Sequence, residues 1–272
     1  MSSDTEISDE SKKTLDLERP HDKGKIDGKT GDFFTYSGIT IIANVKDRLV
    51  SGSQWEEAHN FIARDPVLSK YYTPLPCSSY HMTVCGLPTV AGQKDKSPKT
   101  FNAYLVKNKE AFINLWNMMN KDDQYIPEGT MTGIGGSSVI SITMDHSVKS
   151  ATHGKRICDA CCRDLGVKHS ASYRSHITLA YKYRSIGIFD QISVKKAIGR
   201  LWKILKVLEV EFEPANLMIF QDMTAFVPTN PNNWSDEPLL SVPLTDPSTM
   251  THAFNCRPVK KIEEEEKKEE KE

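Results

Sequence analysis

The chain has 272 residues, of which 38% are hydrophobic and 26% are charged, enough for one large folded domain or two small ones. Lys and Arg total 35 and Asp and Glu total 36, so the formal net charge of -1 excludes a global basic field for nucleic acid and leaves only a local polyanion site. No apolar run approaches the roughly 18–20 residues that cross a bilayer, which excludes a membrane-spanning helix.

The cysteines and the N-terminal sequence indicate the compartment. The first residues lack the basic and apolar segments of a secretory signal. Six cysteines without such a signal favour a reducing compartment with free thiols. We therefore expect a cytoplasmic monomer without a membrane partner, with the nucleus as the alternative location.

Both ends of the chain are polar and charged. Residues 1–30 mix charged residues with scattered Gly and are predicted to be a disordered arm. Residues 258–272 are rich in Glu and Lys and are predicted to be a solvated tail. The folded domain is expected between them, at residues 31–257. The charged ends are candidate handles for an unidentified protein partner.

Strands and helices are predicted to alternate within this domain. The predicted strands cover 38–45, 80–86, 138–145 and 175–182, with two short strands in 209–223 separated at Pro214. The predicted helices cover 53–65, 100–120, 148–165 and 189–208. Ser53 followed by Glu56 is a capping-box signature for the first helix, and Gly166 ends the third. Residues 133–138 lack the Lys-Ser/Thr of a phosphate loop and are predicted to form a turn.

One four-residue pattern occurs twice, as His81-Met82-Thr83-Val84 and as His176-Ile177-Thr178-Leu179. Each copy ends a set of strand, helix and motif strand, which suggests an internal duplication with one motif in each of two similar lobes. On a strand, residues i and i+2 point to one face, so the His and Thr of each copy share a face and the apolar residues share the other. If the lobes face each other, two imidazoles and two hydroxyls converge on one site.

Such a site suits phosphoryl transfer without a metal. Histidine titrates near neutrality, so one imidazole can be neutral while the other is protonated. The neutral imidazole can take a proton from the attacking oxygen, and the protonated one can give a proton to the leaving oxygen. The threonine hydroxyls can donate hydrogen bonds to the non-bridging phosphate oxygens, where charge builds up. Two such matches among 8 histidines arise by chance in on the order of one in a hundred chains. The alternative interpretation is two half-buried histidines beside threonines that favour strands.

The two motifs resemble the paired His-x-Thr-x motifs of the 2H phosphoesterase superfamily, and most of all a little-characterised subfamily of unknown function. The resemblance covers roughly residues 33–228. It implies a two-lobed α+β fold with antiparallel sheets around a central cleft and helices outside. It also implies a metal-independent hydrolase without a cofactor, acting at a ribose 2′ oxygen. Substrates of that family include 2′,3′-cyclic phosphates, 2′,5′-linked oligonucleotides and RNA ends.

The resemblance carries roles onto four residues of this chain. By motif match His81 and His176 are the acid and base, in an order that the sequence does not decide. Thr83 and Thr178 are the phosphate ligands by the same match. The alternative function is a non-catalytic module that binds nucleotide or RNA on the same fold. A weaker reading is an interaction protein that uses its charged ends.

Residues near the motifs supply further candidates. Arg174 and Ser79 each precede a motif histidine by two residues, so an extended strand would point both toward the substrate. Tyr181 and Tyr183 fall on the opposite face and are interpreted as packing residues. The candidate aromatic platforms for a nucleobase, each more readily explained as core, are Phe34, Tyr36 and Phe226.

A cysteine cluster offers a metal site as an alternative. Cys158, Cys161 and Cys162 lie close together in sequence, with His146 and His153 upstream. A zinc site usually shows two paired sets of ligands, and no second Cys-x-x-Cys follows. The three cysteines are interpreted as small hydrophobic residues on the buried face of a helix.

Overall fold

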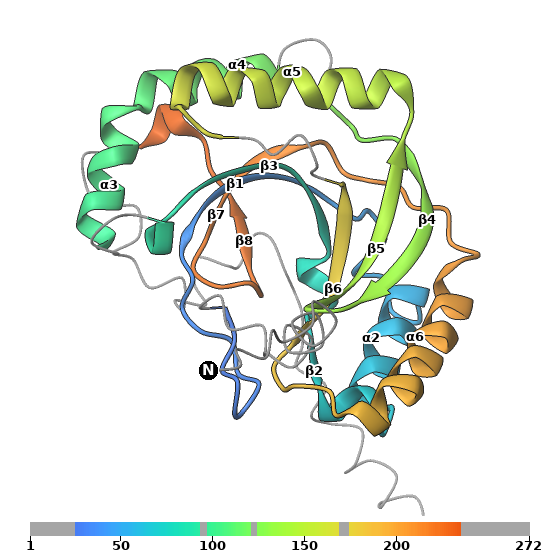
Figure 1. Cartoon of the computed structure of the whole chain (residues 1–272). Helices are drawn as coiled ribbons and strands as arrows, with labels where there is room; N and C mark the ends of the chain where they lie inside the picture. Colours follow the sequence, from blue (N-terminus) through green and yellow to red (C-terminus); the bar gives the residue numbers. More distant parts are fainter. Residues whose placement is uncertain (1–24, 93–96, 121–123, 169–173, 235–272) are drawn as a thin grey trace, which may run out of the picture. The chain divides into compact units, whose positions relative to one another are not determined.

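The computed structural model describes residues 25–92, 97–120, 124–168 and 174–234 (Figure 1). The chain divides into two compact units, Met1–Leu240 and Ser241–Glu272, and every described residue belongs to the first. The predicted arm therefore lies outside the described residues except for 25–30, and the predicted tail lies outside them completely. Within 25–30, Ile26 is fully buried and forms a β-bridge with Phe33.

The described strands form one eight-stranded antiparallel sheet in the order β4-β5-β6-β3-β1-β7-β8, and β2 pairs with β6. The strands are β1 (Gly38–Asn44), β2 (Tyr72–Pro74), β3 (His81–Thr89), β4 (Gly129–Gly136), β5 (Val139–His146), β6 (His176–Lys182), β7 (Asn216–Phe220) and β8 (Phe226–Pro228). The described helices are α2 (Gln54–Arg64), α3 (Pro98–Lys107), α4 (Lys109–Asn120), α5 (Val148–Leu165) and α6 (Gln191–Leu205). The predicted α+β class with antiparallel strands is confirmed.

Most of the hydrophobic core lies between the helices and one face of the sheet. Helix α5 packs against β3 and β5 with α4 beside it, and α6 packs against β4 with α2 beside it (Figure 1). Ile41 of β1, Ile142 of β5 and Ile177 of β6 are fully buried in this core. Their neighbours along each strand point to the opposite face, because side chains alternate in a strand.

Local signals explain where two of the helices begin and end. The Ser53 hydroxyl accepts a hydrogen bond from the Glu56 amide, as the predicted capping box requires, whereas the Glu56 carboxylate accepts its bond from the Gly52 amide, one residue before the cap. Helix α5 ends at Gly166, whose φ of 65° is left-handed, as predicted. No helix within the described residues is long and apolar enough to cross a membrane.

Some element boundaries differ from the prediction. The predicted helix 100–120 is two helices separated at Asn108, whose backbone (φ -104°, ψ 13°) leaves the helical range. Residues 133–136, predicted as part of a turn, form the end of β4, and only the two serines that follow turn the chain. Residues 209–223 contain one strand, β7, and an isolated bridge between Phe212 and Val45. The short strands β2 and β8 were not predicted.

The two predicted sets meet at the centre of the sheet. β1, α2 and β3 form the first set, and β5, α5 and β6 form the second in the same order. β3 pairs with β1 and β6 pairs with β5, while β3 and β6 pair with each other. The strands that carry the two His-x-Thr motifs are therefore direct neighbours.

Candidate active site

The motif residues lie on the sheet face that points away from the helices. The motif quartet consists of His81, Thr83, His176 and Thr178. Met82 and Ile177 are partners across β3 and β6, and both belong to the core, with exposed fractions of 1% and 0%. Side chains alternate along a strand, so the quartet projects from the other face. All four residues are half-buried.

The strand register places the quartet residues opposite one another. Continuing the antiparallel pairing from Met82 and Ile177 sets His81 opposite Thr178 and Thr83 opposite His176. The two histidines are then diagonal neighbours, whose Cβ atoms lie about 7–8 Å apart in such sheets. Each histidine thus has a hydroxyl across from it and the second imidazole within reach of a shared ligand.

Both motif histidines are held by the same type of backbone hydrogen bond. His81 Nδ1 lies 2.6 Å from the Ser79 carbonyl oxygen, and His176 Nδ1 lies 2.9 Å from the Arg174 carbonyl oxygen. A carbonyl oxygen only accepts, so each Nδ1 carries a hydrogen and donates it. This fixes the tautomer and assigns the exchange of protons with a ligand to Nε2 in both rings.

The electrostatic environment keeps His81 neutral. Burial of its ring is the largest cause that lowers its pKa from 6.5 to about 4, while its hydrogen bond to the backbone acts in the opposite direction. The positive charges of His176, Lys25 and Arg48 lower the pKa further. His81 is therefore unprotonated near pH 7 and can accept a proton.

An irregularity in β6 turns Tyr181 toward the quartet. The pairing with β5 shifts by one residue after Thr178, so that Ala180 rather than Leu179 pairs with Ile140. Ile140 faces the core, and the extra residue reverses the alternation that follows. Tyr181 therefore lies on the face of the quartet, and its predicted position on the opposite face is wrong.

A chain of ring contacts starts at His81 and reaches Tyr36, and Lys25 links Tyr36 to Tyr181. The aromatic arc consists of Phe226, Phe220, Tyr36 and Tyr181. Phe226 lies 4.4 Å from the His81 ring and 5.2 Å from Phe220, and Phe220 stacks on Tyr36 at 6.3 Å between centroids. Of the three candidate platforms, Phe226 thus contacts the quartet, Tyr36 is connected to it through Phe220 and Phe226, and Phe34 is 44% exposed.

Lys25 bridges Tyr36 and Tyr181 of the aromatic arc. Its ammonium lies 5.1 Å from the centroid of the Tyr36 ring and 5.4 Å from that of Tyr181. It also donates a long hydrogen bond of 3.5 Å to the Tyr181 hydroxyl. Sequence reasoning missed this lysine because it fell in the predicted arm. The apolar residues Ile26 and Phe33 on either side of Asp27-Gly28 were the signal for a short hairpin there.

The two further candidates, Ser79 and Arg174, contribute backbone groups to the site. Ser79 ends a short 3-10 turn, Cys77–Ser79, is 1% exposed, and donates its hydroxyl hydrogen to the Pro76 carbonyl. The extended geometry assumed for it therefore does not hold, and what it supplies is the carbonyl that binds His81. Arg174 is exposed and supplies the equivalent carbonyl to His176. Contact of its guanidinium with substrate stays a prediction.

A buried arginine supports the turn that precedes His81. Arg48, 3% exposed, donates to the Ser78 carbonyl at 3.2 Å and pairs with Glu213 at 2.6 Å. Glu213 also accepts a hydrogen bond from Asn44, which is the partner of His81 on β1. This network was not predicted, because its members are far apart in sequence.

The surface beyond the second motif carries little side-chain bulk. Thr143 of β5 pairs with His176, and Gly133 of β4 pairs with Thr143. A Cβ atom built on Gly133 or on Gly135 would meet nothing within 4 Å. The sheet therefore leaves open space next to the quartet for an extended ligand.

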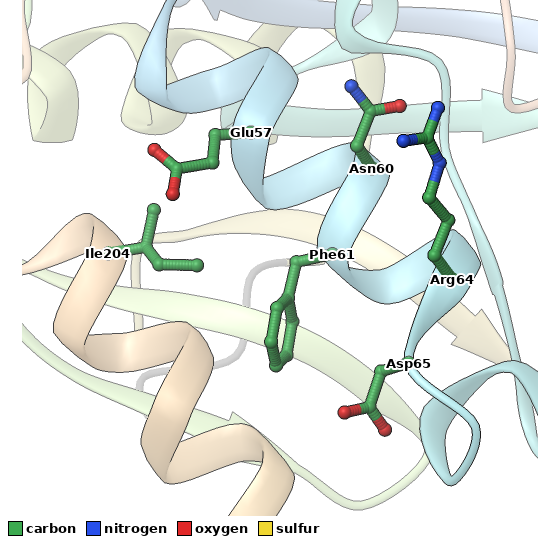
Figure 2. Close-up of a pocket in the computed structure, with 6 residues that line it drawn as sticks. All are labelled: Glu57, Asn60, Phe61, Arg64, Asp65 and Ile204. Atoms are coloured by element: carbon green, nitrogen blue, oxygen red, sulfur yellow. The ribbon is translucent and has the colours of Figure 1, made fainter.

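A pocket of about 370 Å³ lies elsewhere, between α2 and α6. Figure 2 shows its lining residues, which are Glu57, Asn60, Phe61, Arg64, Asp65 and Ile204. Asp65 accepts hydrogen bonds from the Val67 and Leu68 amides and pairs with Arg200 at 2.6 Å. Because this carboxylate is fully engaged and no quartet residue lines the pocket, we interpret the pocket as a groove between packed helices.

The cysteines of α5 pack against β3. Cys161 is fully buried, Cys158 and Cys162 are half-buried, and the Cys158 thiol donates to the Val84 carbonyl at 3.2 Å. Upstream, the His153 ring packs against Tyr125. Within the described residues, no group of three or more His, Cys, Asp or Glu side chains is arranged to hold a metal ion.

Comparisons with known proteins bear on the fold. No protein-family model matches the chain, and no curated protein matches it significantly. The crystal structure of the conserved protein of unknown function ATU0111 from Agrobacterium tumefaciens is similar, with a TM-score of 0.59 and 19% sequence identity. The similarity covers 82% of this chain and 98% of that chain. At this identity the likeness shows a shared fold alone.

Proposed function

We propose that the protein is a metal-independent phosphodiesterase of the 2H type that acts on a nucleotide or RNA substrate at a ribose 2′ oxygen. The observation that carries this proposal is the pairing of Met82 with Ile177, which gathers the quartet on one face of the sheet. The matched hydrogen bonds from each Nδ1 to a carbonyl oxygen support it, because they prepare both rings for proton transfer.

In the proposed reaction His81 is the base and His176 the acid. The lowered pKa of His81, about 4, favours the neutral base for this ring. For a 2′,3′-cyclic phosphate, His81 Nε2 takes a proton from water as the water oxygen attacks phosphorus. The bond from phosphorus to one ribose oxygen breaks, and that oxygen takes a proton from Nε2 of His176. The Thr83 and Thr178 hydroxyls donate to the non-bridging oxygens.

The proposal extends to the architecture. The sets β1-α2-β3 and β5-α5-β6 would be the two lobes of a 2H-type fold, related by duplication and joined at β3 and β6. Each lobe would supply one histidine and one threonine. Two similar acid–base groups serve a reaction whose attacking and leaving oxygens lie on opposite sides of phosphorus.

Incubation of the purified full-length chain with a substrate panel tests the proposal. The panel contains 2′,3′-cyclic nucleotides, 2′,5′-oligoadenylates and short RNAs, all in the presence of EDTA, with products resolved by mass. We expect turnover of at least one class, unchanged by the chelator. Loss of turnover with EDTA that zinc or magnesium restores would refute the metal-independent mechanism. Tight binding without turnover would favour the nucleotide-binding module instead.

A further inference from the structure

We infer that Lys25 forms a second anion subsite on the face of the quartet and binds a second phosphate of the substrate. The inference rests on the proposed function for the class of ligand. It narrows that class to substrates with two phosphates, such as an oligonucleotide end, in preference to a mononucleoside cyclic phosphate.

Lys25 is held in place by folded structure. Its neighbour Ile26 is fully buried and forms a β-bridge with Phe33, and Phe33 packs edge-on against Tyr181 at 6.2 Å. The turn between the bridged residues is closed by the Asp27 carboxylate, which accepts two backbone hydrogen bonds. The lysine therefore presents its ammonium from a fixed backbone, which lowers the entropic cost of binding an anion.

The surroundings of the ammonium suit an anion. The faces of Tyr36 and Tyr181 attract a cation through their ring electrons and hold the ammonium beside the quartet face. A phosphate oxygen can bind a lysine held this way as a charge-assisted hydrogen-bond acceptor. With a net charge of -1 on the whole chain, such local cations have to supply the attraction for a polyanion.

The position of Lys25 relative to the quartet fits one nucleotide. Because of the extra residue in β6, Thr178 and Tyr181 pair with Ser141 and Val139, which are two residues apart on β5, a distance of about 7 Å at the rise of a β-strand. The positive charge of Lys25 contributes to lowering the pKa of His81, which places the two side chains within electrostatic range of each other. A substrate phosphate on the quartet would therefore leave the next phosphate along the backbone close to Lys25.

The test compares two dinucleotides that differ in one charge. Both are adenylyl-adenosine with a terminal 2′-phosphate, and in one of them a neutral methylphosphonate replaces the internal phosphodiester. Calorimetry on the full chain measures both affinities. We expect the wild type to bind the phosphodiester about 10-fold more tightly. Lys25→Ala should bind both alike, and Lys25→Arg should keep most of the difference.

Lys155→Ala is the matched control, because it removes one positive charge from an exposed ion pair on α5. It should leave the difference unchanged, and thermal unfolding should show that every variant is folded. Equal binding of the two dinucleotides by the wild type, or no binding of either, would overturn the inference. The inference would also be overturned if Lys25→Ala lost the same amount of affinity for both dinucleotides. Calorimetry needs no turnover. If the wild type bound the phosphodiester more tightly but catalysed no reaction, the anion subsite would be supported and only the catalytic proposal would be refuted.

Discussion

The rings of His81 and Phe226 meet edge to face, 4.4 Å apart between centroids, on the sheet face that carries the motif quartet. Phe226 in turn packs against Phe220, so the His81 ring borders an apolar surface made of two phenylalanine rings. Burial of this kind is the main cause that lowers the pKa of His81 to about 4. Phe226 is thus part of what keeps His81 neutral, as the proposed base has to be.

Truncating the Phe226 side chain should shift the pH dependence of the proposed activity. In Phe226→Ala water reaches the His81 ring, so its pKa should rise from about 4 toward 6.5. The base must be neutral, so the acidic limb of kcat/KM should move to higher pH by the same amount. A pH profile between about 3.5 and 8 on a verified substrate measures this shift.

Phe189→Ala is the matched control, because the same truncation falls on a side chain that is 96% exposed. It should leave the acidic limb in place, and Phe226→Leu should restore most of the wild-type profile. An unchanged limb in Phe226→Ala, in a variant that remains folded, would show that the ring contact does not set the pKa of His81.

The same pKa shift predicts how stability depends on pH. The unfolded chain binds a proton at His81 with a pKa near 6.5, and the folded chain does so only near 4. Between these values the unfolded state holds more protons, so the free energy of unfolding should fall as pH decreases from 6.5 to 4. Urea unfolding between pH 6.5 and 4 should show a smaller loss of unfolding free energy for His81→Gln than for the wild type. An equal loss in both proteins would contradict the shift.

The centre of the site could be predicted from the sequence because strand periodicity is simple. His and Thr two residues apart share a face, and two short apolar strands with this pattern were enough to predict the quartet. The register between β3 and β6 could not be predicted, because one backbone pairing, Met82 with Ile177, decides it. Pairing of this kind depends on the whole sheet and not on local pattern.

The surroundings of the quartet escaped prediction for identifiable physical reasons. A one-residue shift in β6 reversed the side on which Tyr181 lies, and bulges leave no reliable trace in a single sequence. Ser79 was assumed to be extended, but a 3-10 turn ends there. Lys25 was assigned to a disordered arm by composition, although the buried Ile26 next to it ties that segment to the fold.

If the proposed function is correct, removing either histidine should abolish most of the activity. His81→Ala and His176→Ala should each reduce kcat by about 100-fold or more, the usual effect of losing a positioned acid or base. The double variant should be little worse than either single one, because the two rings act as one unit. Steady-state kinetics on one substrate measures all three.

The threonines should have smaller effects on the same assay. Thr83→Ala and Thr178→Ala each remove one hydrogen bond to a phosphoryl oxygen, which should cost about 10-fold in kcat/KM. All these variants should remain folded, since the four quartet side chains are only half-buried. Near wild-type turnover in either histidine variant would refute the acid–base pair and favour the binding module.

The buried Arg48 should matter for stability and activity together. Arg48→Ala removes hydrogen bonds to the Val45 and Ser78 carbonyls and leaves Glu213 without its cation. We expect a loss of about 2–4 kcal/mol in the free energy of unfolding, as for other buried charged groups. Urea unfolding at pH 7 measures the loss.

Lys46→Ala is the control, because its ion pair with Glu211 is exposed and should contribute at most about 1 kcal/mol. In Arg48→Ala the turn before β3 loses its support, and with it the Ser79 carbonyl that orients His81. We therefore expect kcat to fall as well, at a temperature where the variant is still folded, with little change in KM. If folded Arg48→Ala kept the wild-type kcat, the turn would hold the His81 carbonyl without help from the arginine.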